Sequence, residues 1–316
     1  MRPDAAHPER GSFVRDQVAA LRALGGADVE LYEFAPGARA LARAALELRG
    51  RFGSARGGAG AGSRAPFDVV HAHFGLTAWP ALAAPARVRA LTLHGTDLSH
   101  PRTRLLTLAA LPRIEVLATV SRALADELPR RAARRAQVLP CGVDLDRFAP
   151  IARTHARSQL GLDADRPYLL FAADPARPEK RFDRARELAA SLDVELLALG
   201  GVEPARVPLL VNGANAVLVP SEREGFGLAA LEALACDVPV LATPVGIHSE
   251  ALADLPGTLC APFDVDRWRA ALLPLLARDG DDGRRIDGRA RAERWSAARM
   301  AERVIAAWSV ARERAG

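Results

Sequence analysis

Apolar positions along the chain alternate between a helical period and the period of a strand. Residues 13–25, FVRDQVAALRALG, have helical spacing and stop at Gly25, and residues 28–34, DVELYEF, then alternate as a strand does. Four short apolar stretches follow, each leading into a helical one: FDVVHAHF, VRALTLHG, EVLATVS and AQVLPCG. This rhythm predicts a parallel sheet with helices on both faces.

The rhythm breaks between Gly142 and Pro167, in a segment rich in charged and turn-forming residues. It then restarts with the strand-like stretches YLLFAAD, DVELLALGG, NAVLVPS and VPVLATPVG, separated by helical ones, and the tail from residue 294 reads as an amphipathic helix. The pattern predicts an α/β protein of two doubly wound, Rossmann-like domains, 1–149 and 150–316, with the last helix in the second. Such domains face a cleft at the carboxyl ends of their strands.

The composition limits the partner and the compartment. Aromatic residues make up only 5% of the chain, too few for platforms that stack single-stranded nucleic acid, and the net charge of +5 comes from arginines spread along its whole length. We therefore expect no nucleic-acid partner. Three widely spaced cysteines support neither a disulfide framework nor a zinc site, no stretch has ~18 apolar residues in a row, and the start lacks a signal-peptide core. These features predict a cytoplasmic protein.

The stretch 220–246, PSEREGFGLAALEALACDVPVLATPVG, concentrates the candidate chemistry. A strand ends at Pro220, a glycine-containing turn follows, and a helix begins, which suits a phosphate bound on backbone amides. Glu224 precedes that helix and Glu232 lies two turns into it, so eight residues separate them by about 12 Å. The spacing indicates an elongated polar ligand with a carboxylate at each end. The alternative, two solvated helix charges, fits the strand–turn–helix context less well.

Lys180 is the only lysine in a chain that has 42 arginines. It lies in RPEKR, at a loop just before a helix, where a compact point charge differs from a planar guanidinium. This position favours a functional charge over a lysine that stands there by chance.

These stretches together resemble a known family. EGFGLAALEALACDVPVLATPVG is similar to the E-x7-E signature of retaining glycosyltransferases with the GT-B fold, the family 4-like, group 1 enzymes that include bacterial mannosyltransferases and sucrose-phosphate synthases. HGTDL at 94–98, TVSRALADEL, LPCGVDLDRFAP and RPEKRFDRA resemble other family segments and follow in the expected order. The resemblance covers nearly the whole chain, most strongly residues 66–253.

The resemblance implies a role for each matching residue. Glu224 would bind hydroxyl groups of the donor sugar, Glu232 those of the ribose, Lys180 would neutralise the leaving diphosphate, and His94 would lie near the anomeric centre. The implied donor-binding set also includes the amides that hold the distal phosphate and two further positions: Gly225, Phe226, Gly227, Leu228, Arg177 and the loop residue Gly11. Residues 1–149 would then be the acceptor side and 150–316 the donor domain.

The implied activity is metal-independent transfer of a hexose from a nucleotide diphosphate sugar to a hydroxyl acceptor, with retention of configuration and with no cofactor. The acceptor is a glycan, a lipid-linked molecule or a small molecule. Two alternatives remain open: a related nucleotide-sugar epimerase, which needs no acceptor, and a binding or partner protein with weakened catalysis. The basic run PRRAARRAQ is read as a solvated helix end, with peripheral contact at the inner face of the membrane as its rival.

Several positions depart from the family pattern. No strand precedes the loop at Gly11, so we expect an upstream reading frame to supply one. The usual arginine before the lysine is out of register, and Arg177 is its nearest substitute. Asp237 and Ile247 stand where glycine is common, and only aspartate tolerates the left-handed conformation well. The short segment between LLALGG and NAVLVPS leaves the base undefined.

His71 and His73, in VVHAHF, are a further pair. We expect them to point to opposite faces of their strand, which argues against a shared metal ion and is compatible with His73 at a substrate.

Overall fold

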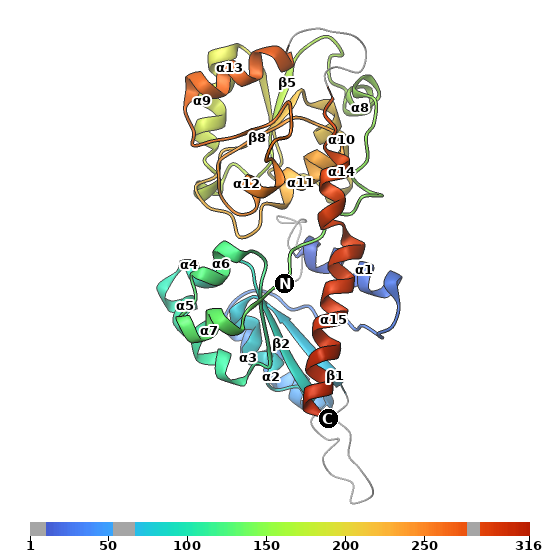
Figure 1. Cartoon of the computed structure of the whole chain (residues 1–316), viewed down its shortest axis with the longest axis vertical. Coiled ribbons are helices and arrows are strands. Elements are labelled where there is room, and N and C mark those ends of the chain that lie inside the picture. The colour runs from blue at the N-terminus through green and yellow to red at the C-terminus, as the bar shows by residue number, and fades with distance from the viewer. Residues whose placement is uncertain (1–10, 53–66, 277–284) are drawn as a thin grey trace, which may run out of the picture. The chain divides into compact units, whose positions relative to one another are not determined.

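The computed structural model describes residues 11–52, 67–276 and 285–316, and the chain forms two compact α/β units (Figure 1). The first unit comprises Phe13–Cys141 and Ala298–Gly316, and the second Gly142–Ala297. This division differs from the expected one in two respects. The boundary falls eight residues earlier than 149, and the last helix belongs to the first unit.

The contacts of the last helix, α15 (Ala297–Ala315), explain this assignment. Its apolar stripe is buried, and in the first unit the Trp308 indole Nε1 donates to His71 Nδ1 at 3.2 Å. Arg312 lies 3.7 Å from Asp68 of the same unit. An amphipathic pattern predicts the helix but does not reveal which sheet will cover its apolar face.

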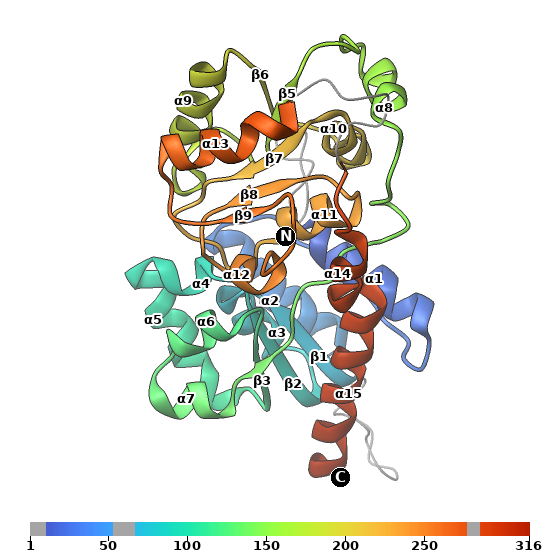
Figure 2. The same cartoon turned by 45° about the horizontal axis from the view of Figure 1, so that its top comes forward.

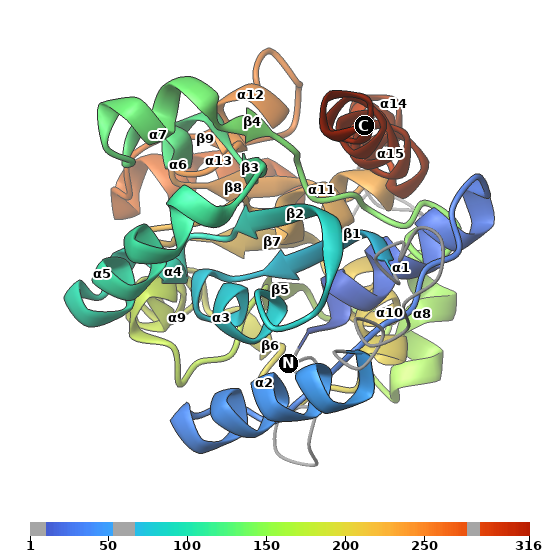
Figure 3. The same cartoon turned by 90° about the horizontal axis from the view of Figure 1, so that it is seen from below.

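The first unit contains a four-stranded parallel sheet in the order β1–β2–β3–β4. Its strands are β1 (Phe67–His73), β2 (Ala86–Leu93), β3 (Val116–Thr119) and β4 (Gln137–Val138). Its helices are α1 (Ser12–Leu24), α2 (Ala38–Phe52), α3 (Ala78–Ala81), α4 (Thr96–Ser99), α5 (Pro101–Ala110), α6 (Arg122–Asp126), α7 (Arg130–Arg135) and α15, with short 3-10 turns η2 (Gly75–Thr77) and η3 (Leu111–Arg113). Figure 3 shows α2 and α3 on one side of this sheet and α15 on the other.

Residues 28–34 are not a strand, so the sequence-based prediction was wrong there. Within residues 11–52 no strand precedes β1, and β1 pairs with β2. Leu31 and Phe34 of this segment instead line a cavity of about 180 Å³ together with Val69 of β1. Alternation alone does not make a strand, because the backbone needs a ladder partner.

The second unit contains a five-stranded parallel sheet in the order β6–β5–β7–β8–β9 (Figure 2). Its strands are β5 (Tyr168–Phe171), β6 (Glu195–Ala198), β7 (Ala216–Val219), β8 (Val240–Ala242) and β9 (Leu259–Cys260). Its helices are α8 (Arg153–Leu160), α9 (Phe182–Leu192), α10 (Val207–Gly213), α11 (Leu228–Ala235), α12 (His248–Ala251), α13 (Val265–Leu276) and α14 (Arg289–Ala292), with 3-10 turns η4 (Pro178–Lys180), η5 (Pro204–Arg206) and η6 (Glu293–Trp295). None of the described helices in either unit is both long enough and apolar enough to cross a bilayer.

Helices cover both faces of the second sheet, as its continuous apolar strands predict. On one face α9 and α13 pack together on β5, β7 and β8 in a core that includes Leu188 and the fully buried Trp268. Helices α10 and α11 contact each other and also contact β5, β7 and β8. The expected α/β architecture of two parallel-sheet domains is therefore confirmed.

The strand order of the second sheet contains one reversal, between β5 and β7. From β5 the chain moves outward to β6, and it then returns to the other side of β5 to add β7, β8 and β9. In doubly wound folds ligands bind at the carboxyl edge of the sheet, where the strand order reverses. The topology alone therefore predicts a ligand beside the loops that follow β5 and β7.

Two of the departures from the family pattern are resolved by backbone geometry. Asp237 adopts the left-handed conformation, with φ 56°, and its Oδ1 accepts the amides of Gly288 and Arg289 at the start of α14. Ile247 has φ −98°, so a β-branched residue is unstrained there. The prediction that aspartate replaces glycine in a left-handed position is confirmed, and position 247 does not need that conformation.

Candidate functional site

Lys180 and Glu224 meet at the reversal point of the second sheet. Lys180 ends η4, in the loop after β5, and Glu224 lies in the loop after β7. Lys180 Nζ donates to Glu224 Oε2 at 2.6 Å, and the two side chains are only 12% and 10% exposed. Ser221 Oγ donates to the other carboxylate oxygen at 2.8 Å. Both oxygens of Glu224 are therefore held.

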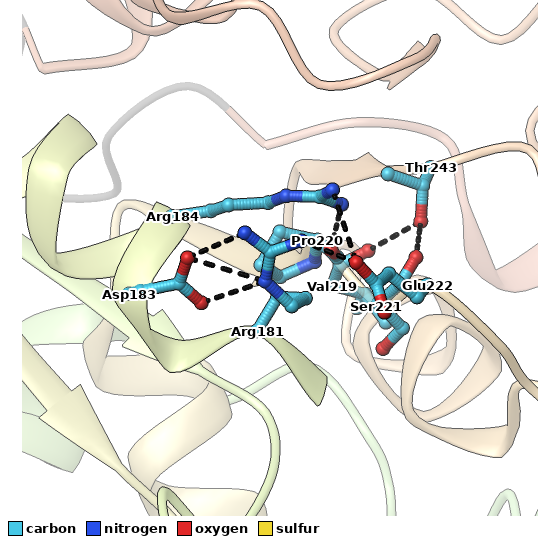
Figure 4. Close-up of polar contacts among 8 residues, drawn as sticks. All are labelled: Arg181, Asp183, Arg184, Val219, Pro220, Ser221, Glu222 and Thr243. Carbon is cyan, nitrogen blue, oxygen red and sulfur yellow. Dashed lines mark hydrogen bonds and ion pairs between the residues drawn. The ribbon is translucent and has the colours of Figure 1, made fainter. Parts of the chain in front are cut away.

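Further contacts fasten these two loops to each other (Figure 4). The Glu222 amide donates to the Glu179 carbonyl at 2.9 Å, and Arg181 forms ion pairs with Asp183 and Glu222. Arg184 Nη1 donates to the Pro220 carbonyl at 3.0 Å. These contacts therefore hold together the two loops that carry Lys180 and Glu224. No sequence pattern predicts these contacts, because the partners lie 41 and 36 positions apart in the chain.

The turn before α11 is closely packed and needs its glycines. Gly227 caps the helix with φ +105°. Gly246, in the loop after β8, has φ +60°, and a Cβ there would lie 2.2 Å from the Phe226 carbonyl oxygen. The Ile247 amide donates to that same oxygen at 2.8 Å. The loop after β8 therefore fixes the turn formed by Gly225, Phe226 and Gly227, and α11 begins directly beyond it at Leu228.

Glu232 lies in the second turn of α11 and is partly buried. The structure therefore has one carboxylate before this helix and one within it, as the sequence predicts.

Three polar residues near this turn were not predicted from the sequence: Ser221, Thr243 and His248. Thr243 Oγ1 donates to the Ser221 carbonyl, and the Thr243 carbonyl accepts from His248 Nδ1 at 2.9 Å. All three are buried. Ser221 and Thr243 follow the ends of β7 and β8, so the position of a polar residue just after an apolar strand was the available signal.

Arg177 and Gly11 complete the predicted donor-binding set. Arg177 is half exposed and pairs with Glu179 through Nε at 3.0 Å and Nη2 at 2.6 Å, so its charge is directed to a neighbour in its own loop. Gly11 lies directly before α1, is buried and has φ 72°.

The first unit holds His94 at the carboxyl end of β2. Its Nε2 lies 3.0 Å from His73 Nδ1, and the rings of Phe13 and Phe74 each lie 4.8 Å from its ring. Burial, with a smaller contribution from His71, lowers the pKa of His94 to about 3. The ring is therefore neutral at physiological pH, and one of its nitrogens accepts while the other donates.

Asp97 fixes the loop that carries His94. Its carboxylate accepts the His94 amide at 2.6 Å and the Gly75 amide at 2.5 Å. Burial raises the pKa of Asp97, although both amides favour the ionised form. The HGTD motif therefore combines a histidine with the aspartate that shapes its loop.

His71 and His73 share one face of β1, so the expectation of opposite faces was wrong. Their rings stack with centroids 4.7 Å apart, because residues two apart on a strand point the same way. The Trp308 indole donates to His71 Nδ1, so a neutral His71 carries its proton on Nε2 and donates to Thr92 Oγ1 at 2.8 Å. Burial lowers the pKa of His71 to about 4. Among the described residues, no group of histidine, cysteine and acidic side chains is arranged to hold a metal ion.

The fold defines the class. Over 95% of this chain and 92% of the other, the structure is similar to sucrose-phosphate synthase from Thermosynechococcus elongatus, with a TM-score of 0.67 and 20% identity. It is also similar to Anabaena HepE in complex with UDP-glucose, with a TM-score of 0.61 and 17% identity over 89% and 86% of the two chains. Both units therefore have the parallel-sheet α/β architecture of GT-B glycosyltransferases.

Sequence comparison gives the family. Residues 11–147 match glycosyltransferase family 4, and residues 156–293 match glycosyl transferases group 1. The D-inositol 3-phosphate glycosyltransferase of Actinosynnema mirum is 32% identical over 317 aligned positions, which cover 78% of this chain and 73% of that protein. The protein of the same description from Xylanimonas cellulosilytica is 31% identical over 276, covering 69% and 65%. The chain belongs to the family 4, group 1 glycosyltransferases.

The matched region spans 65% of the Xylanimonas protein and 60% of the corresponding Geodermatophilus obscurus protein.

Proposed function

We propose that the protein transfers a hexose from a nucleotide diphosphate sugar to a hydroxyl acceptor with retention of anomeric configuration. The observation that carries the proposal is the Lys180–Glu224 pair, which stands beside the start of α11 at the reversal point of a parallel sheet. A helix start and a lysine together suit a diphosphate, and a carboxylate suits sugar hydroxyls.

In this proposal each residue has a separate task. Lys180 and the amides from Gly225 to Leu228 bind the diphosphate, Glu224 binds hydroxyl groups of the donor sugar, and Glu232 binds the ribose. His94 faces the donor sugar. Arg177 is the weakest member of the set, because its guanidinium is already paired with Glu179.

The proposed reaction is a same-face displacement. The bond between the anomeric carbon and the diphosphate oxygen breaks, a bond to the acceptor oxygen forms on the same face, and the acceptor proton passes to the departing phosphate. Lys180 and the start of α11 stabilise the charge that develops on the diphosphate. We propose that the reaction needs neither a metal ion nor a cofactor, and activity that survives EDTA would support this.

Relatives suggest which substrates to test first. HepE was crystallised with UDP-glucose and with UDP, and curated relatives carry the description D-inositol 3-phosphate glycosyltransferase. UDP sugars and a phosphorylated polyol are therefore the first donor and acceptor candidates. Lipid-linked and glycan acceptors form the second group. We further propose a cytoplasmic protein.

The basic helix α7 is the proposed contact for anionic membrane lipids. It contains RRAARR, but Arg135 already donates to the Ile114 and Leu111 carbonyls, so the helix end is partly structural. Sedimentation with phosphatidylserine vesicles at low salt, lost at high salt and absent with phosphatidylcholine, would support this contact.

A thermal-shift screen followed by a transfer assay tests the proposal. UDP, GDP, ADP and their sugars are screened first, and a ligand at 100 times its Kd adds about 2.7 kcal/mol of stability. The donor that binds is then incubated with and without acceptors, and the anomeric configuration of the product is read by NMR. Product formed without an acceptor would indicate an epimerase, and binding without any turnover would indicate a binding protein.

A further inference from the structure

His248 carries a buried nitrogen that has no hydrogen-bond partner. The residue begins α12 and is fully buried. Its Nδ1 lies 2.9 Å from the Thr243 carbonyl oxygen, which can only accept, so Nδ1 carries the proton. Nε2 of the neutral ring is then an acceptor, and within the described residues it has no partner. A buried polar atom left unpaired costs about 1–3 kcal/mol, so its retention needs a reason.

The position of Nε2 supplies a reason. A Cβ built on Gly227 would lie 2.5 Å from this nitrogen, so the ring edge packs directly against Gly227, the residue that caps α11. No side chain separates the imidazole from the helix start. An unpaired nitrogen therefore stands beside the place where backbone amides favour an anion.

Burial and the charged groups around the ring together set its protonation. Burial is the main effect and lowers the pKa of His248, Lys180 acts in the same direction, and Glu224 opposes them. Arg291 of α14 donates to the Ala251 carbonyl at the far end of α12. The neighbouring elements also carry Glu232 of α11, Glu250 of α12, and Arg289 and Arg291 of α14, and the turn before α11 carries Glu222 and Arg223.

We propose that His248 is a proton-linked positioning residue of the α11 site: when a diphosphate binds at the start of α11, His248 takes up a proton on Nε2. This inference rests on the proposed function, because it requires a nucleotide diphosphate sugar at that site. A bound anion favours the imidazolium, and the imidazolium in turn favours the anion. Linkage requires the two effects to be equal.

The first test uses the free protein. In ¹⁵N-histidine NMR spectra, His248 should show the tautomer with the proton on Nδ1 at pH 7.5. The proton on Nε2 instead would overturn the inference. His248→Asn is the variant used to test the role of the proton. Its amide nitrogen can still donate to the Thr243 carbonyl, but its side chain cannot take up a proton.

The second test measures proton uptake on binding. UDP-glucose is titrated into the full chain by calorimetry at pH 6.5, in two buffers with different ionisation enthalpies. Its diphosphate is esterified at both ends, so the ligand itself does not titrate there. The wild type should take up a fraction of one proton, and its Kd should fall about threefold from pH 7.5 to 6.5, below the tenfold limit for one linked proton.

Two variants make the result specific. His248→Asn should lose both the uptake and the pH dependence, whereas His155→Asn, which removes an exposed histidine of the same unit in α8, should keep them. His248→Gln serves if His248→Asn fails to fold. Binding by the wild type without proton uptake, or uptake that persists in both His248 variants, would overturn the coupling alone. Failure of every nucleotide sugar to bind would overturn both the coupling and the proposed function.

Discussion

Lys180 Nζ donates to Glu224 Oε2 at 2.6 Å, although the two residues stand 44 positions apart in the chain. The pair is the meeting point of two loops that leave β5 and β7 on either side of the reversal in strand order. In the proposed reaction the two side chains act on adjacent parts of the donor, the diphosphate and the sugar. Their contact means that replacing either one disturbs the other.

Lys180→Ala should lower turnover by at least about 100-fold, because a charge that acts on the leaving group is felt most strongly in the transition state. It should also lower the free energy of unfolding by about 1–3 kcal/mol, since Glu224 loses a charged partner in a nearly buried position. Lys180→Arg should restore stability better than turnover. Steady-state kinetics and urea unfolding measure the two effects. Unchanged kcat in Lys180→Ala would remove this residue from the mechanism.

The single lysine also allows chemical labelling. An amine-selective acylating reagent has the Lys180 side chain and the N-terminus to modify. Acylation of Lys180 should abolish transfer. Saturating nucleoside diphosphate should slow the acylation of Lys180 but not that of the N-terminus. Peptide mass spectrometry measures both rates. Equal rates with and without nucleotide would place Lys180 outside the binding site.

Substitutions of Glu224 and Glu232 should weaken the binding of different parts of the donor. Glu232→Ala should weaken binding of the free nucleoside diphosphate by about 1.5–3 kcal/mol, because the ribose loses a charged acceptor. Glu224→Ala should leave that binding much less affected and should weaken binding and transfer of the sugar. Calorimetry with the nucleoside diphosphate and with the nucleotide sugar distinguishes the two. Equal weakening of nucleoside diphosphate binding would contradict the assignment.

Gly227→Ala should destabilise the second unit more than Gly201→Ala. Both glycines have positive φ, +105° and +67°, and alanine costs about 1–3 kcal/mol of strain in such conformations. Only at position 227 does the added Cβ also meet an atom, His248 Nε2 at 2.5 Å, whereas nothing lies within 4 Å at 201. Urea unfolding compares the variants, and His248→Ala should recover part of the Gly227→Ala loss. Equal losses at the two positions would exclude the predicted clash.

Trp308→Phe should cost about 1–3 kcal/mol of the first unit's unfolding free energy, because buried His71 Nδ1 loses its donor. Trp79→Phe is the matched control in the same unit, since its indole donates to the Leu106 carbonyl at an exposed position. That change should cost less than about 1 kcal/mol. Urea unfolding followed by circular dichroism provides the measurement. A smaller loss for Trp308→Phe than for the control would contradict the assigned contact.

The first unit should lose stability as the pH falls from about 6.5 toward 4. Burial lowers the pKa of His71 to about 4 and that of His94 to about 3, and it also lowers the pKa of His73. The unfolded chain therefore binds protons that the folded chain does not, at a maximum cost of about 1.4 kcal/mol per pH unit for each histidine. Urea midpoints at pH 7.5 and 5 should differ less in His71→Gln than in the wild type. An identical acid response in both proteins would contradict the shift assigned to His71.

Local sequence patterns predict most of the strands and helices, the two α/β units and the motif that carries Glu224, Gly227 and Glu232. These follow from local information. Apolar period, glycine position and chain order do not depend on which distant segment becomes a neighbour. The sequence also predicts a left-handed turn at Asp237, which is confirmed, and it predicts a functional charge at Lys180 through the contrast with the arginines.

Which segments contact each other becomes clear from the folded chain alone. Residues 28–34 alternate between apolar and polar but are not a strand, because no neighbouring strand of the described chain pairs with them. Helix α15 packs on the first unit, where Trp308 contacts His71. His248 reached the Gly227 turn because β7 and β8 are neighbours in the sheet. The period of apolar and polar residues predicts on which face of a helix or strand each side chain lies. What it touches depends on contacts between residues tens or hundreds of positions apart, and these form only when the chain folds.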